Sequence, residues 1–180
     1  MDKIVSVRKI DEYYMSRALS LASRGQGAAS PNPMVGCVIV RDGQVIGEGY
    51  HARCGSEHAE VAALGDLARR GGTARGAVVY VNLEPCSHFG RTPPCAPRLV
   101  EEGVARVVAG MADPNPRVNR GGLEILRAGG VEVDGPCLES ECRWLNRGFI
   151  RVQTLGRPWV TLKAAAGLDG RMAQIGRAHV

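Results

Sequence analysis

The sequence predicts an α/β fold, in which a mixed sheet of about five strands is covered by helices on both faces, giving three layers. The first observation is a hairpin pattern, because a β-branched run at 35–41 and a second strand at 44–50 flank the turn-forming pair Asp42-Gly43. The second observation is that strand-like and helix-like patterns alternate from there to about residue 151. Such alternation after an initial hairpin is typical of a mixed sheet between two layers of helices.

A helix is expected before the hairpin. Asp11 is suited to cap its N-terminus, because a carboxylate can accept a hydrogen bond from a free backbone N–H, and Gly25 is suited to end it. Its apolar face is formed by Tyr14, Ala18, Leu21 and Ala22. A loop rich in turn-forming residues, GQGAASPNP at 25–33, leads from this helix to the hairpin.

The rest of the chain is expected to supply three more strands and four more helices. The strands are predicted at 77–83, 104–111 and 131–134, and the helices at 57–70, from Cys95, through 121–130 and at 139–151. The last helix should bury Cys142, Leu145 and Phe149 if it is amphipathic. Ligands of such sheets gather where strands end and helices begin, so a site is expected around 85–95 and the DPNP loop at 113–116.

Composition excludes several classes of partner. The chain has 23 Lys and Arg residues against 18 Asp and Glu residues, a net charge of +5, but only 4% aromatic residues and no run of basic residues. We therefore expect a small anionic substrate and no nucleic acid. No apolar run approaches the roughly 20 residues of a membrane span, and the N-terminus lacks the apolar stretch of a signal peptide. We expect a cytoplasmic protein with no membrane contact.

Six cysteines in a cytoplasmic protein favour metal binding or catalysis over disulfides. His58 and Glu60 lie two residues apart at the start of a predicted helix, while Cys86 and Cys95 lie either side of a loop that the Pro93-Pro94 pair keeps from being helical. One imidazole and two thiolates suit a tetrahedral zinc with an open fourth position. A His and Glu pair alone is common on exposed helices, but with both cysteines it predicts a zinc that holds a reacting water beside Glu60.

The spacing resembles that of a known family. A His-x-Glu motif followed by Pro-Cys is characteristic of zinc deaminases, although here eight residues, and not two, separate the cysteines. The other matching segments are PNPMVGCVIV (31–40), GEGYH (47–51), YVNLEPCSHFGRTPPC (80–95) and DPNP (113–116). Together they resemble the deaminase domain of the bifunctional deaminase/reductase family of riboflavin biosynthesis.

This resemblance implies a cytidine-deaminase-like fold and one zinc per chain, held by His58, Cys86 and Cys95, with Glu60 as the catalytic proton shuttle. The implied substrate is 2,5-diamino-6-ribosylamino-4(3H)-pyrimidinone 5′-phosphate, which loses its 2-amino group as ammonia. Cys54 lies four residues before His58, but in a Gly-containing loop outside the matched positions, so we do not expect it to bind the metal.

The implied substrate-binding residues are Asn32, His51, His88, Arg91, Asp113 and Asn115. All of them except His51 also have a simpler interpretation. The histidine at position 88 would stiffen its loop, the arginine would face solvent, and the Asn and Asp side chains would form Asx turns. The corresponding functional interpretations are that the arginine binds the phosphate bidentately and that the carboxamide of Asn32, fixed between two prolines, recognises the pyrimidine. Asp113 and Asn115 would hold ribose hydroxyls.

Two other functions remain open on the sequence alone. One is a deaminase of another nucleoside or of a tRNA base, against which the wide cysteine spacing argues, because those enzymes typically use C-x-x-C. The other is a non-catalytic zinc-binding domain, against which Glu60 argues, because a structural zinc needs no free carboxylate beside it. The resemblance allows a homo-oligomer without fixing its size.

The pattern expected of a new domain begins near residues 153–157, where a linker is followed by Pro158 and the strand-like run WVTLKAAA at 159–166. The segment RPWVTLKAAAGLDGR at 157–171 resembles the beginning of the family's reductase domain. We therefore expect a deaminase domain at 1–152 and the linker and first strand of a truncated reductase domain at 153–173. NADPH would bind only to a complete reductase domain.

Residues 174–180, QIGRAHV, do not resemble the family and match the translation of a sequencing adapter, so we expect a non-native tail. A divergent natural terminus is the alternative.

Overall fold

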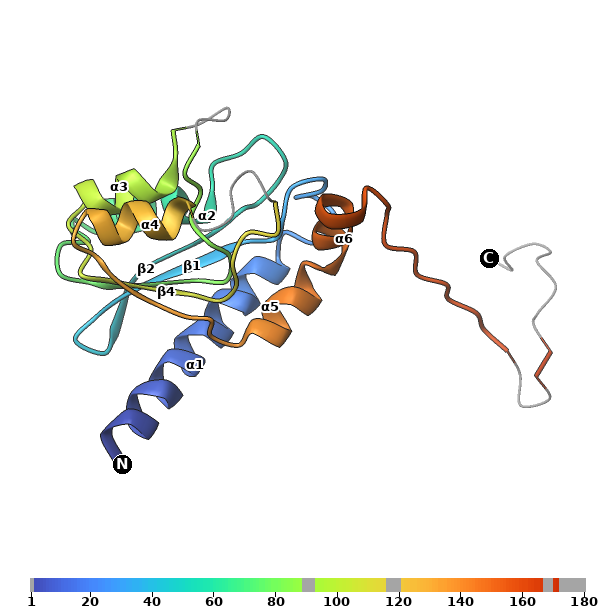
Figure 1. Cartoon of the computed structure of the whole chain (residues 1–180), viewed down its shortest axis with the longest axis horizontal. Coiled ribbons are helices and arrows are strands. Elements are labelled where there is room, and N and C mark those ends of the chain that lie inside the picture. Colours follow the sequence, from blue (N-terminus) through green and yellow to red (C-terminus); the bar gives the residue numbers. More distant parts are fainter. Residues whose placement is uncertain (1, 89–92, 116–120, 167–169, 172–180) are drawn as a thin grey trace.

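A computed structural model describes residues 2–88, 93–115, 121–166 and 170–171. Its centre is one five-stranded mixed sheet with the strand order β2-β1-β3-β4-β5 (Figure 1). The strands are β1 Gly36–Arg41, β2 Gln44–Tyr50, β3 Val78–Val81, β4 Arg106–Ala109 and β5 Glu132–Asp134. β1 runs antiparallel to β2 and β3, whereas β3, β4 and β5 are parallel. The predicted mixed sheet of five strands is confirmed.

Helices cover both faces of the sheet. On one face lie α2 Ala59–Arg69, α3 Cys95–Glu101 and α4 Gly121–Ala128, and on the other lie α1 Asp2–Ser23 and α5 Glu139–Leu145 (Figure 1). Alternate strand residues point to opposite faces, so the sheet contributes to two apolar cores. Leu67, Leu99 and Leu126 from the three helices fill the first core, and Met15 and Ala18 from α1 fill the second. The three-layer prediction is therefore confirmed.

The start of the first helix was predicted wrongly. α1 begins at Asp2, so Asp11 lies in its interior and does not cap it. Residues 2–10 contain no Gly or Pro that would end a helix, so the helix continues toward the N-terminus. Asp11 is instead buried, with 8% of its surface exposed, and its carboxylate accepts hydrogen bonds from the Arg106 guanidinium at 3.0 and 2.8 Å. This residue connects α1 to β4.

The helix predicted at 139–151 is broken at Asn146 into α5 and α6, which spans Arg147–Leu155. The buried carboxamide of Asn146 accepts a hydrogen bond from the Met34 N–H at 2.8 Å and donates one to the Met34 carbonyl at 2.9 Å. Asn82, at the end of β3, donates to the same carbonyl at 3.0 Å and accepts from the Gly36 N–H at 2.8 Å. Two buried amides therefore fix the segment that follows Asn32.

The predicted burial of the last helix is only partly confirmed. Cys142 is fully buried, but Leu145 and Phe149 are half-buried. Phe149 belongs to α6, after the break at Asn146, and lines the pocket.

Within the described residues the strand expected at 159–166 is not formed, because residues 157–165 are irregular and extend away from the sheet, and only residue 166 is in a β-bridge (Figure 1). Val160 and Leu162 are 81% and 91% exposed, and Trp159 makes an edge-to-face contact with Trp144. A strand needs a neighbour to pair its backbone groups, and no described strand lies beside this segment. The expected tail at 174–180 lies outside the described residues.

None of the described helices is both long and apolar enough to cross a membrane.

Candidate metal centre and substrate pocket

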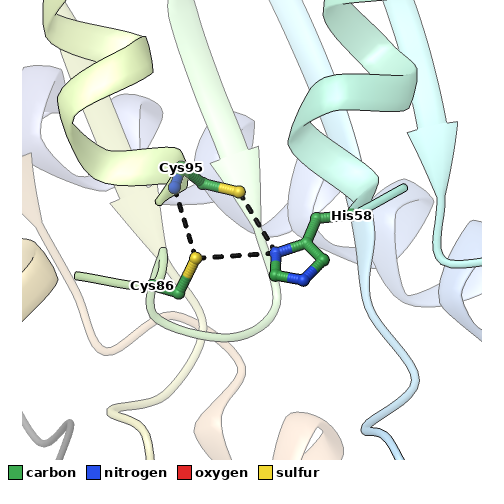
Figure 2. A group of neighbouring side chains, drawn as sticks. All are labelled: His58, Cys86 and Cys95. Carbon is green, nitrogen blue, oxygen red and sulfur yellow. Dashed lines mark hydrogen bonds between the residues drawn. The ribbon is translucent and has the colours of Figure 1, made fainter. Parts of the chain in front are cut away.

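Three side chains predicted to bind zinc meet at the ends of three elements (Figure 2). His58 is the N-cap of α2, Cys86 lies in the loop after β3, and Cys95 is the first residue of α3. The Nδ1 atom of His58 lies 3.5 Å from the Cys86 Sγ and 3.3 Å from the Cys95 Sγ. Ligand atoms around a tetrahedral zinc lie roughly 3.6 Å apart, from Zn–N and Zn–S bonds of about 2.0 and 2.3 Å. The three residues fit such an ion.

The electrostatics of the cluster also fit a divalent cation. A hydrogen bond from the Cys95 thiol, and then others from His58 and the Cys95 backbone N–H, lower the pKa of Cys86. The same thiol hydrogen bond, together with burial, raises the pKa of Cys95. The hydrogen bond with Cys86 raises the pKa of His58. Both sulfur atoms thus lie within hydrogen-bonding distance of the His58 Nδ1, and a metal ion would replace the protons that the three ligand atoms share.

Glu60 lies beside this cluster without belonging to it. It is the second residue of α2, and only 4% of its surface is exposed. Burial and then the negative charge of Cys86 raise the pKa of Glu60 to about 7. A zinc ion held by the three ligands would lower this pKa. A carboxyl group in this position is suited to accept and return a proton near neutral pH.

A cavity of about 240 Å³ is lined by Glu60 and by two residues of the metal cluster, His58 and Cys86. Among its lining residues are five of the six predicted substrate-binding residues, namely Asn32, His51, His88, Asp113 and Asn115. The sixth, Arg91, lies outside the described residues. The loop between the cysteines, the DPNP loop and the loop before β1 therefore converge on one pocket.

His51 and Asn32 form a fixed pair at the wall of this pocket. The buried His51 ring places its Nδ1 2.9 Å from the carbonyl oxygen of Glu57, and a carbonyl can only accept a hydrogen bond. Nδ1 therefore carries the proton, and Nε2 of the neutral ring accepts a hydrogen bond from the Asn32 amide nitrogen at 3.0 Å. The pair orients the Asn32 carboxamide at the pocket wall.

Asp113 and Asn115 form the Asx turn that the simpler interpretation required. The Asp113 carboxylate accepts a hydrogen bond from the Asn115 backbone N–H at 2.8 Å. Burial raises the pKa of Asp113, and both side chains nevertheless line the pocket. Cys54 is exposed in its loop and does not belong to the metal cluster.

Glu84, Phe149 and Gln153 also line the pocket and were not predicted to do so. Phe149 and Gln153 reach it because α6 begins anew at Arg147, which the pattern of a continuous amphipathic helix could not indicate. Glu84 had one signal in the sequence, an acidic residue at the end of an otherwise apolar strand.

Comparison with known proteins agrees with this geometry. Residues 8–111 match the family model described as the cytidine and deoxycytidylate deaminase zinc-binding region. The riboflavin biosynthesis protein RibD of Escherichia coli is 55% identical over 163 residues, which cover 91% of this chain and 44% of that protein.

Solved structures agree as well. Acinetobacter baumannii RibD superposes with a TM-score of 0.85 at 49% identity, over 91% of this chain and 45% of that one. The Thermotoga maritima diaminohydroxyphosphoribosylaminopyrimidine deaminase/5-amino-6-(5-phosphoribosylamino)uracil reductase gives a TM-score of 0.89 at 43% identity, over 93% and 48% of the two chains. The chain spans about half the length of the relatives it matches.

The five-stranded sheet is thus a cytidine-deaminase-like fold, and a zinc-binding His, Cys, Cys triad with an adjacent Glu is typical of it. The matching region contains His58, Glu60, Cys86 and Cys95, and the chain belongs to the family of cytidine and deoxycytidylate deaminases that this zinc-binding region defines.

Proposed function

We propose that this chain catalyses the hydrolytic deamination of 2,5-diamino-6-ribosylamino-4(3H)-pyrimidinone 5′-phosphate in riboflavin biosynthesis. The observation that carries the proposal is that a buried carboxylate, Glu60, lines the same cavity as two residues of the metal cluster, His58 and Cys86. The similarity to RibD proteins, at 55% identity for that of Escherichia coli, supports this choice of substrate within the family.

In this mechanism, the chain's own residues hold the metal and move the protons. His58, Cys86 and Cys95 would bind zinc, which when bound lowers the pKa of a coordinated water from about 16 toward 7. Glu60 accepts a proton from the attacking water and returns protons to the ring nitrogen and the departing amine. One water is consumed, the carbon–nitrogen bond to the amino group breaks, and a carbonyl and ammonia are formed.

The same proposal gives the remaining pocket residues roles in binding. Asn32, oriented by His51, recognises the donor and acceptor edge of the pyrimidine, and His88 contacts the substrate from the loop between the cysteines. Asp113 and Asn115 hold the ribose hydroxyls. The support for these roles is that all five side chains line one cavity with Glu60.

Arg91 is proposed to bind the 5′-phosphate. A charge-assisted hydrogen bond contributes on the order of 1.5–3 kcal/mol, so Arg91→Ala should lower kcat/KM by roughly ten- to a hundredfold. The dephosphorylated substrate should show a similar loss with the unaltered protein and little further loss with the variant. Steady-state rates of the four combinations test the pairing, and fully additive losses would contradict it.

The substrate itself is tested by ammonia release. The protein loaded with zinc should release ammonia from the pyrimidinone phosphate much faster than from cytidine or from a tRNA anticodon stem-loop. Preference for either alternative would assign the chain to another deaminase. Bound zinc without ammonia release from any of the three would favour a non-catalytic zinc domain.

We also propose that residues 1–155 form the deaminase domain, because α6 continues three residues past the boundary expected at 152 and Gln153 lines the pocket, and that 156–173 are a linker and the beginning of a second domain. The support is that Val160 and Leu162 are almost fully exposed, as expected of apolar residues that pack against something other than the deaminase domain.

A further inference from the structure

Glu84 joins two segments of the pocket that are distant in sequence. It follows β3 by three residues, directly precedes Pro85-Cys86, and is 3% exposed. One carboxylate oxygen, Oε2, accepts a hydrogen bond from the Asp113 backbone N–H at 3.0 Å. The other, Oε1, accepts one from the Gly122 backbone N–H at 3.0 Å. The side chain also lines the cavity beside the metal cluster.

Both hydrogen bonds require a carboxylate. Gly122 is the second residue of α4, so its N–H has no acceptor within the helix, and a negative charge at a helix N-terminus is stabilising. Asp113 belongs to the loop after β4, a different element. A carboxylate offers two acceptor oxygens, one to each segment. A carboxamide has only one oxygen, and its NH₂ group would face the N–H of the other segment.

The packing around Glu84 is close, so the position of this residue affects the segments that contact it. A Cβ atom added to Gly122 would lie 1.8 Å from the carbonyl oxygen of Pro85, so the start of α4 rests directly on the residue between Glu84 and the zinc ligand Cys86. The Glu84 backbone N–H also donates to the Met111 carbonyl at 2.9 Å, two residues before Asp113. Glu84 therefore fixes the loop at 113–115 relative to the loop that carries Cys86.

We propose that Glu84 is a positioning residue for substrate binding, whose carboxylate holds the 113–115 loop so that Asp113 and Asn115 face the pocket. This inference rests on the proposed function, because it assigns those two side chains to the substrate. It differs from a role in metal binding, since Glu84 is not among the ligands, and from a role in the chemical step, since Glu60 is the carboxylate beside the metal.

Glu84→Gln separates these roles. The variant should keep one zinc per chain and a kcat within about threefold of the parent, while KM for the pyrimidinone phosphate rises about tenfold, because misplacing binding groups weakens substrate binding. Glu124→Gln is the matched control, because Glu124 is an exposed acidic residue in the first turn of the same helix. It removes a charge from that helix terminus and should leave KM unchanged.

Hydrogen exchange gives a readout that does not depend on activity. The backbone amides of Asp113 and Gly122 should exchange faster in Glu84→Gln and at the parent rate in Glu124→Gln. If the parent does not deaminate the pyrimidinone phosphate, the proposed function fails, and this exchange difference still decides whether Glu84 holds the loop.

Glu84→Asp provides a second variant in case the first does not fold. It keeps the charge but is one methylene too short to reach both amides, so its KM should also rise. An unchanged KM and unchanged exchange at Asp113 in a folded variant would overturn the proposal. Loss of zinc, or a fall in kcat at constant KM, would overturn it as well by assigning Glu84 to the metal or to the chemical step.

Discussion

Glu60→Gln should lower turnover by about a thousandfold or more while leaving the zinc content at one ion per chain, because a positioned acid–base group contributes about 10²–10⁴ to the rate. Glutamine has nearly the same shape as glutamate, so the buried site beside His58 stays filled. It cannot accept a proton from water or return one to the leaving amine. None of the three metal ligands is altered.

The measurement is kcat for ammonia release, together with metal analysis of the same preparation. Glu57→Gln is the matched control, since Glu57 is an exposed glutamate directly before His58 and only its backbone carbonyl contacts His51. It should keep both turnover and zinc. A Glu60→Gln variant that retains more than a tenth of the turnover would exclude Glu60 as the proton shuttle, and one that loses its zinc would make Glu60 part of the metal site.

The metal cluster could be predicted from sequence because its determinants are local. His58 and Glu60 share the first turn of one helix, and Cys86 and Cys95 flank a single loop whose prolines keep it irregular. Residue type and spacing therefore carry most of the information. The structure adds only that the two segments meet, with Nδ1 of His58 as the ligand atom nearest both sulfurs.

Residues whose role depends on distant partners could not be predicted in the same way. The partners of Glu84 are backbone amides 29 and 38 residues away, and those of Asn146 are 112 residues away. Backbone groups leave no signature in the sequence, so a buried acid or amide gives no indication of which segment it holds. Asp11 was also mispredicted because its partner is distant. The partner is the side chain of Arg106, 95 residues away, and a lone Asp is typical of an N-cap.

The strand expected at 159–166 shows that a local sequence pattern is not sufficient to form a strand. Trp159, Val160 and Thr161 have a high strand propensity, but that propensity reflects packing against neighbouring strands and is realised only when such strands are present. One residue accounts for the difference between the single helix expected at 139–151 and the observed α5 and α6. Asn146 interrupts the helix and binds the backbone of Met34, and Phe149 of α6 lines the pocket.

Cys95→Ser should remove the zinc, whereas Cys54→Ser should leave it in place. Cys95 is 1% exposed, and its Sγ lies 3.3 Å from the His58 Nδ1, within the cluster of three ligand atoms. A serine hydroxyl is neutral at pH 7 and replaces a soft thiolate by a hard oxygen, so it binds zinc far more weakly. Cys54 is exposed in its loop and lies outside the cluster, and the same chemical change there should be neutral.

Zinc per chain, measured after dialysis against a weak chelator, should be close to one for the parent and for Cys54→Ser and below about a tenth for Cys95→Ser. Because a ligand that binds only the folded state stabilises it by about 4 kcal/mol at a thousand times its Kd, a strong chelator should lower the Tm of the parent and of Cys54→Ser. It should leave the Tm of Cys95→Ser unchanged, since that variant has no metal to lose. If Cys54→Ser released the zinc and Cys95→Ser retained it, the ligand assignment would be wrong, and the loop at 52–57 would have to fold over the pocket to reach His58.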